Sequence, residues 1–203
     1  MGLLLRDSIM IDVHRFFTSV RHTLFNGTMT QSQVDGCNAI LSGFDSRYPN
    51  GDFKKLAYYF ATAYWETAQS MQPVREAYYL GEPAAENYRK TLWYYPWYGR
   101  GYVQLTLEDN YKRESKPDRT GVDLHADREK ALEPEVAAQA MFVGMEYGDY
   151  GGGPISGYFS DTVERPVDAR YLVNGTDHAQ DIANVYWKFK AAIMPVPDAI
   201  PSA

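Results

Sequence analysis

Two glutamates, Glu66 and Glu76, have the residue type and the spacing for acid–base chemistry on a glycosidic bond. In an inverting glycosidase one carboxyl group protonates the leaving oxygen, while the other activates a water from the opposite face. These carboxyl groups stand about 6.5–9.5 Å apart, whereas ten residues of straight helix rise by about 15 Å. The chain must therefore bend between the two glutamates, and Pro73 lies between them.

Glu66 lies on or beside the apolar face of a predicted helix, three residues after Ala63. This face follows the i, i+3, i+4, i+7 rhythm and consists of Leu56, Tyr59, Phe60, Ala63 and Thr67. A carboxylate there must be paired, hydrogen-bonded or held partly protonated, because burial disfavours its charged form. The partly protonated state is the one that a general acid needs.

Pro73 cannot continue this helix and disfavours helical geometry at Gln72, so we expect the helix to end at about Met71. Glu76 then lies on the returning chain. An ordinary structural role for the glutamates is the alternative, since Arg75 and Arg89 are available as salt-bridge partners.

Four ordered segments surround the two glutamates: Tyr64-Trp65-Glu66-Thr67-Ala68, Met71-Gln72-Pro73-Val74-Arg75-Glu76-Ala77-Tyr78, Tyr98-Gly99-Arg100-Gly101-Tyr102-Val103-Gln104-Leu105-Thr106 and Asp109-Asn110-Tyr111. Together they resemble the catalytic core of family 19 glycoside hydrolases, most closely the phage and bacterial branch with lysozyme-like endolysins. A weaker likeness continues through residues 169–175 and the final helix, so the resemblance spans roughly residues 54–194.

The resemblance implies a role for each glutamate. In the family, a glutamate in a His-Glu-Thr type segment is the general acid, which corresponds to Glu66. A second acidic residue after the helix is the general base, which corresponds to Glu76. This second position varies more within the family, so Glu82 and Glu86 remain alternative bases. Trp65 stands where the family usually has histidine, so any role of that histidine in orienting the acid or binding substrate is lost or has moved.

The same resemblance implies which residues bind the sugar. In the family, the Gly-Arg-Gly-x-x-Gln-Leu-Thr segment and the Asn-Tyr pair that follows it line the sugar cleft. We therefore expect ligand contacts from Tyr98, Arg100, Gln104, Thr106, Asn110, Arg170 and Asn174. Aromatic residues also crowd the segment 78–98, where they either stack on sugar rings or form a small core under a long loop.

The length and charge of the chain limit its organisation and its partners. With 203 residues we expect a single catalytic domain, with a helical scaffold at 1–50, a core at about 54–194 and a loose tail at 195–203. The 20 basic and 26 acidic side chains give a net charge of −6, which argues against a nucleic-acid partner. This charge also provides no general attraction to an anionic cell envelope.

We expect a monomer that needs no metal and no other cofactor. The single cysteine, Cys37, excludes an intramolecular disulfide and lies in an apolar helical pattern rather than in a Cys/His site. The four histidines lack ligand spacing. The apolar run in residues 1–7 is too short for a signal peptide or a membrane span, so we expect a cytoplasmic product that is later released to the cell wall.

Helices dominate the predicted elements, which indicates a mainly α, lysozyme-like fold with a small β-sheet beside a sugar-binding cleft. We expect helices at about 10–25, 30–41, 54–71, 134–147 and 167–173, and a last one from residue 177. A short strand is predicted at 102–105, and Thr106 is expected to cap the helix that carries Asn110.

The sequence and the resemblance together indicate an inverting glycoside hydrolase that cleaves β-1,4 bonds between N-acetylated sugars in the glycan strands of peptidoglycan, with a role as a phage lysis protein. Chitin oligomers are the alternative substrate. A non-catalytic module that binds wall glycan and a structural virion protein are the alternatives from other classes, and turnover of a glycan would exclude both.

Overall fold

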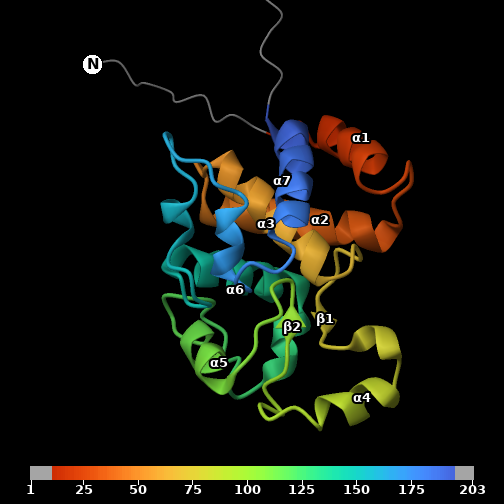
Figure 1. Cartoon of the computed structure of the whole chain (residues 1–203), viewed down its shortest axis with the longest axis vertical. Helices are drawn as coiled ribbons and strands as arrows, with labels where there is room; N and C mark the ends of the chain where they lie inside the picture. The colour runs from red at the N-terminus through yellow and green to blue at the C-terminus, as the bar shows by residue number, and fades with distance from the viewer. Residues whose placement is uncertain (1–10, 195–203) are drawn as a thin grey trace, which may run out of the picture.

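The computed structural model describes residues 11–194, and Figure 1 shows its helices in two groups around α6 (Pro134–Tyr147). One group contains α1 (Val13–Thr23), α2 (Gln31–Arg47), α3 (Phe53–Glu66) and α7 (Ala179–Ile193). The other group contains β1 (Val74–Arg75), α4 (Ala84–Arg89), β2 (Arg100–Gly101) and α5 (Glu108–Glu114). Short 3-10 helices connect these elements: η1 (Tyr78–Leu80), η2 (Arg128–Leu132), η3 (Ile155–Gly157) and η4 (Asp168–Leu172).

The described part of the chain is mainly helical, and its sheet consists of the antiparallel pair β1 and β2. Val74 lies opposite Gly101, and Arg75 lies opposite Arg100. The predicted mainly α fold class with a small sheet is therefore confirmed. Within residues 11–194, every helix is too short or too polar to cross a membrane.

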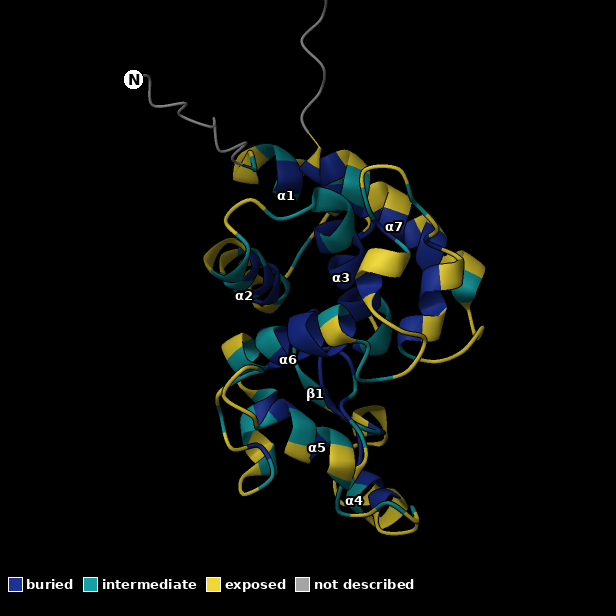
Figure 2. Cartoon of the chain, turned by 90° about the vertical axis from the view of Figure 1, so that its left-hand side faces the viewer, coloured by how far each residue is buried: buried dark blue, intermediate teal, exposed yellow. Residues whose placement is uncertain are grey.

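Helix α3 is the buried centre of the molecule. Asp52 caps its first turn by accepting a hydrogen bond from the Lys54 backbone N–H (2.8 Å). Every residue from Leu56 to Tyr64 is buried, so this helix is enclosed on all sides rather than on one face (Figure 2). Phe60 stacks on Phe189 of α7 with the ring centroids 5.0 Å apart. Glu66, the last residue of α3, thus lies where the helix leaves the core.

The end of α3 at Glu66 contradicts the prediction that the helix continues to about Met71. The chain reverses there in a Schellman motif, in which the Gln69 N–H donates to the Tyr64 carbonyl (2.7 Å) and the Ala68 N–H to the Trp65 carbonyl (3.1 Å). Ala68 has φ +46°, in the left-handed region that glycine usually occupies at this position. The sequence therefore lacks the usual helix stop signal.

Helix α2 also differs from its prediction, because it continues to Arg47 rather than ending near Leu41. Its N-cap is Thr30, and Ser42 and Gly43 lie inside the helix. One residue further, Phe44 packs edge-on against Phe142 of α6, with the ring centroids 6.0 Å apart. This tertiary packing outweighs the weak local preference of serine and glycine to end a helix.

The segment around β2 corrects two further predictions. The strand lies at Arg100–Gly101 rather than at 102–105. Thr106 does not cap α5, since its hydroxyl donates to the Gln104 carbonyl (2.7 Å) and Leu107 occupies the N-cap position. Helix α5 does carry Asn110, as predicted.

Gly36 of α2 lets the loop after α3 pass close by, because a Cβ at this position would lie 1.6 Å from the Met71 carbonyl oxygen. We expect Gly36→Ala to lower the free energy of unfolding by about 3 kcal/mol, since either α2 or the loop must move. Urea unfolding measures this change. The matched control is Gly157→Ala, where an added Cβ meets nothing within 4 Å. Equal stability of the two variants would contradict the close approach.

Glu114, the last residue of α5, is a buried carboxyl group with an unusual environment. Both of its side-chain oxygens lack a hydrogen-bond partner within the described residues. Burial, followed by the negative charge of Asp149, raises the pKa of Glu114 to about 8 against the opposing charges of Arg119 and Arg113. The carboxyl group is therefore mostly protonated at pH 7.

We expect this group to make the folded protein less stable as the pH rises. The unfolded chain releases the Glu114 proton near pH 4.5, whereas the folded chain keeps it up to a pKa of about 8. In that window the group lowers the free energy of unfolding by about 1.4 kcal/mol per pH unit. Glu114→Gln, which cannot ionise, should remove this slope. Unfolding of both proteins from pH 4 to 9 tests it, and parallel curves would contradict the raised pKa.

Candidate active site

Glu66 presents its carboxylate at the C-terminal end of α3, where it forms an ion pair with Arg170. Its Oε1 accepts a hydrogen bond from Nη1 of Arg170 at 2.5 Å. The Arg170 side chain is 3% exposed and that of Glu66 is 15% exposed, so the pair lies at the edge of the core. Of the three states that the sequence allows for Glu66, the structure shows the paired one. Within residues 11–194, the hydrogen bond to the Glu66 side chain goes to Oε1, so Oε2 has no protein donor.

Arg170 reaches Glu66 from η4, which follows α6 in the chain. Its Nε donates to the Asp177 carbonyl at 2.9 Å, so one guanidinium bridges α3 and the loop before α7. The resemblance predicts Arg170 as a sugar contact. Its side chain lies against the predicted acid and is 3% exposed, and a sugar contact from it remains a prediction.

Glu76 follows β1 directly, and both of its carboxylate oxygens are held. Oε2 accepts the Gly99 backbone N–H (2.9 Å), and Oε1 accepts the Tyr94 hydroxyl (2.8 Å). Burial and the hydrogen bond to Glu76 raise the pKa of Tyr94, which keeps its hydroxyl protonated as a donor. Since each carboxylate oxygen has two lone pairs, the anchored group can still accept a hydrogen bond from a water. Neither Tyr94 nor Gly99 was predicted to contact Glu76.

The segments that carry the two glutamates are joined by a direct hydrogen bond. The Tyr78 hydroxyl donates to the Thr67 carbonyl at 3.0 Å. Thr67 follows Glu66 directly, and Tyr78 lies two residues after Glu76. The chain therefore folds back between the glutamates, as the sequence requires, but the reversal begins at the Schellman motif rather than at Pro73 alone.

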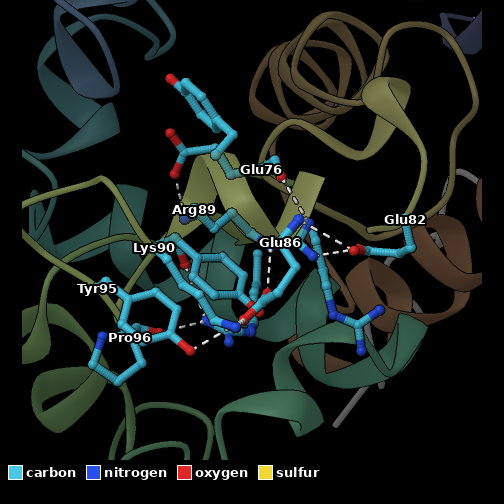
Figure 3. A network of polar contacts seen from close by, with 12 residues as sticks. Glu76, Glu82, Glu86, Arg89, Lys90, Tyr95 and Pro96 are labelled. Atoms are coloured by element: carbon cyan, nitrogen blue, oxygen red, sulfur yellow. Dashed lines mark hydrogen bonds and ion pairs between the residues drawn. The ribbon is translucent and has the colours of Figure 1, made fainter. Parts of the chain in front are cut away.

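The two alternative bases are both engaged by Arg89, a buried residue of α4 (Figure 3). Glu82 forms an ion pair with Nη2 of Arg89, and Glu86 accepts from its Nε at 3.1 Å. Against the cost of desolvation, hydrogen bonds from Arg89 and Tyr95 lower the pKa of Glu86, which weakens it as a base. Arg89 also donates to the Glu76 carbonyl (3.1 Å), so this network supports Glu76 rather than replacing it.

Tyr98 and Arg100, predicted as sugar contacts, are buried inside the segment that holds Glu76. The Arg100 side chain is 3% exposed and forms an ion pair with Glu129 at 3.1 Å. Its guanidinium carbon lies 3.7 Å from the centre of the Tyr98 ring. Both side chains therefore support this segment, and a ligand contact from either one remains a prediction.

Gln104, Thr106 and Asn110 form a chain of hydrogen bonds beside the sheet. Gln104 Nε2 donates to the Val74 carbonyl of β1 (3.0 Å), and Asn110 Nδ2 donates to the Thr106 carbonyl (2.9 Å). All three side chains are half-buried, so they have both a structural role and some surface left for a ligand. Asn174 is exposed on the loop after η4. Sugar contacts from these four residues remain predictions.

The aromatic residues of the segment 78–98 fall into a buried and an exposed group. Tyr98 is buried, whereas Tyr79 is 76% and Trp93 is 84% exposed. The Trp93 ring packs edge-on against Tyr94, the residue that holds Glu76, with the centroids 5.3 Å apart. Exposed aromatic rings next to an anchored carboxylate are suited to stacking on sugar faces.

Cys37 does not take part in this site. It is fully buried in α2, and burial raises the pKa of its thiol to about 12, so it cannot act as a nucleophile near neutral pH. Within residues 11–194, histidine, cysteine, aspartate and glutamate side chains nowhere form the group of three that a metal ion would need.

Similarity to known proteins is found at the level of the fold. No protein-family model and no curated protein sequence matches the chain. Solved structures are similar to the chain. One is a bacterial family 19 chitinase, with 19% sequence identity and a TM-score of 0.58, and the match covers 95% of this chain and 99% of that one. Chitinase C from Streptomyces griseus HUT6037 matches at 18% identity and a TM-score of 0.55, over 90% of this chain and 76% of that one. A mutant of chitinase C matches at 18% identity and a TM-score of 0.50, over 92% of this chain and 94% of that one. The chain therefore has the fold of the family 19 chitinases.

Proposed function

We propose that this protein is an inverting glycoside hydrolase that cleaves β-1,4 bonds between N-acetylated sugars in peptidoglycan. The observation that carries the proposal is the pair of anchored carboxylates. Glu66 is held by Arg170, and Glu76 is held by Tyr94 and Gly99, on two segments joined through Tyr78 and Thr67. The family 19 chitinase fold supports the same reading.

In this mechanism Glu66 is the general acid. When protonated on Oε2, it donates its proton to the leaving oxygen as the glycosidic bond breaks. The carboxylate that remains is stabilised by Arg170, whose Nη1 already donates to Oε1. Substrate that covers the 15% exposed side chain removes the last water around it, so the proton passes directly to the leaving oxygen.

Glu76 is the general base. It accepts a proton from a water that attacks the anomeric carbon on the face opposite the leaving group, so the configuration inverts. The hydrogen bonds to both of its oxygens hold the carboxylate in one orientation. A base held in one orientation keeps the attacking water in line with the anomeric carbon.

Peptidoglycan is the proposed substrate because the four sequence segments resemble the endolysin branch most closely. Release of the enzyme from the cytoplasm to the cell wall during phage lysis fits that substrate. Chitin is the second candidate, because the similar solved structures are described as chitinases. Both polymers have β-1,4 bonds between N-acetylated sugars, so the same carboxyl pair serves either one.

The test is incubation of the purified protein with isolated peptidoglycan and, separately, with chitin hexamers, followed by mass spectrometry of the fragments. New reducing ends from peptidoglycan support the proposal. Cleavage of the chitin hexamers alone would move the assignment to a chitinase. Proton NMR of the first products adds the stereochemistry, since an inverting enzyme releases the α-anomer from a β-linked sugar.

The matched control for the active-site variant Glu66→Gln is Glu146→Gln. Neutralising Glu146 also removes an ion pair, because this residue of α6 binds Lys55 of α3 at 3.2 Å. We expect cleavage by the wild type and by Glu146→Gln, but not by Glu66→Gln. If no protein releases fragments from either polymer, the hydrolase proposal is wrong and a glycan-binding role is tested next by co-sedimentation with peptidoglycan.

A further inference from the structure

The ion pair between Glu66 and Arg170 belongs to a closed ring of contacts. Arg170 donates from Nη1 to Glu66 and from Nε to the Asp177 carbonyl. The next residue, His178, packs its ring against Trp65, with the centroids 4.8 Å apart and the planes at 41°. Trp65 directly precedes Glu66 in α3, so the contacts form a closed cycle from Glu66 through Arg170, Asp177 and His178 back to α3.

His178 is not a core residue, which makes this contact informative. Its side chain is 50% exposed, and its backbone has φ +53°, in the left-handed region where a residue with a Cβ is strained. The imidazole is oriented by Asp181, whose Oδ2 lies 3.1 Å from Nδ1. A half-exposed ring on a strained backbone adds little stability through burial. The contact with Trp65 is better explained by the groups that it holds in place.

The geometry connects His178 to Arg170 through one peptide group. The Asp177 carbonyl that accepts from Arg170 belongs to the peptide bond that ends at the His178 nitrogen. The φ angle of His178 is the rotation that sets this peptide plane relative to the imidazole side chain. Holding the ring against Trp65 therefore also holds the carbonyl against the Arg170 guanidinium.

We propose that Trp65 and His178 are positioning residues for the reaction, and this inference rests on the proposed function. Their contact fixes the Asp177 carbonyl, the carbonyl fixes Arg170, and Arg170 fixes the Glu66 carboxyl group with Oε2 toward the substrate. Losing the contact lets the guanidinium shift. A shift of about 1 Å in a catalytic group lowers the rate by up to about a hundredfold.

The first variant is His178→Gly, because glycine removes the ring and also relieves the strain at φ +53°. We expect kcat to fall by about ten- to a hundredfold with KM and the melting temperature nearly unchanged. Trp65→Phe keeps an aromatic ring and should retain more activity than Trp65→Ala. The double variant Trp65→Ala/His178→Gly should lose no more than the more damaged single variant, since both changes break one contact.

A second readout does not depend on activity. The Arg170 Nε–H donates to the Asp177 carbonyl, so it should give a slowly exchanging signal in proton–nitrogen NMR, and that exchange should accelerate in His178→Gly. The control in the same spectrum is the Arg100 Nε–H, which donates to Glu129 at 3.1 Å and should not change. Arg170→Lys assigns the signal.

The outcomes separate this inference from the proposed function. A wild type that cleaves no glycan contradicts the proposed function, and the NMR experiment then decides the positioning role alone. Faster exchange at Arg170 in His178→Gly supports that role. Unchanged exchange together with unchanged kcat overturns it. A rise in KM at constant kcat also overturns it, because Trp65 and His178 would then contact the substrate directly.

Discussion

Replacing Glu66 by glutamine should lower the hydrolysis of a natural glycan by about four orders of magnitude, the upper end of the range for general acid–base catalysis, and leave the fold intact. Glutamine has nearly the shape of glutamate and can still accept from Arg170 through its amide oxygen. It cannot deliver a proton to the leaving oxygen. Circular dichroism and the melting temperature check the fold, and reducing-end release measures the rate.

The role of the acid is separated from a general loss of activity by changing the leaving group. A nitrophenolate leaves without protonation, so an aryl glycoside of the same oligosaccharide should rescue Glu66→Gln by at least about a hundredfold relative to the natural substrate. An equal loss on both substrates would mean that Glu66 binds the sugar instead of protonating it. Full activity on the natural glycan would remove Glu66 from the mechanism.

Replacing Glu76 by glutamine should lower the rate by at least about a hundredfold, and by the same factor on natural and aryl substrates. The base acts on the water, so the quality of the leaving group does not compensate for its loss. The amide of glutamine also places an N–H₂ group opposite the Tyr94 hydroxyl or the Gly99 N–H, where the carboxylate accepts two hydrogen bonds.

Tyr94→Phe is the matched control for this experiment. It removes the hydrogen bond to Oε1 of Glu76 but keeps the base and the aromatic ring. We expect a smaller loss than in Glu76→Gln, because the Gly99 N–H still holds Oε2. An unchanged rate in Glu76→Gln would move the base to another acid. Glu82 and Glu86 would then be tested next, although Arg89 already engages both.

The location of the two candidate carboxyl groups could be predicted because it rests on local patterns. The apolar rhythm of α3 and the Asp52 cap define the helix, and the side of that helix on which Glu66 lies follows from the same periodicity. Pro73 indicated a break before Glu76. The extent of the burial was underestimated, since every residue from Leu56 to Tyr64 is buried where one face was expected.

The end of α3 could not be predicted, because its stop signal is not in the residue types. Ala68 occupies the left-handed position of the Schellman motif in place of glycine. The Thr67 hydroxyl accepts the Met71 N–H (3.1 Å), and Met71 packs against Gly36 of α2. These tertiary contacts stabilise a backbone that alanine alone does not favour.

The sequence by itself determined the helical scaffold, the position of Glu66 on the buried central helix and the return of the chain toward it before Glu76. Only the tertiary structure decided what each carboxyl group touches. Glu66 meets Arg170, which is 104 residues away, and the Glu76 carboxylate meets Tyr94 and Gly99. The physical reason is that periodicity and capping report how a segment folds on itself. The partner of a buried charge depends on which distant segments the packed core brings within hydrogen-bond reach.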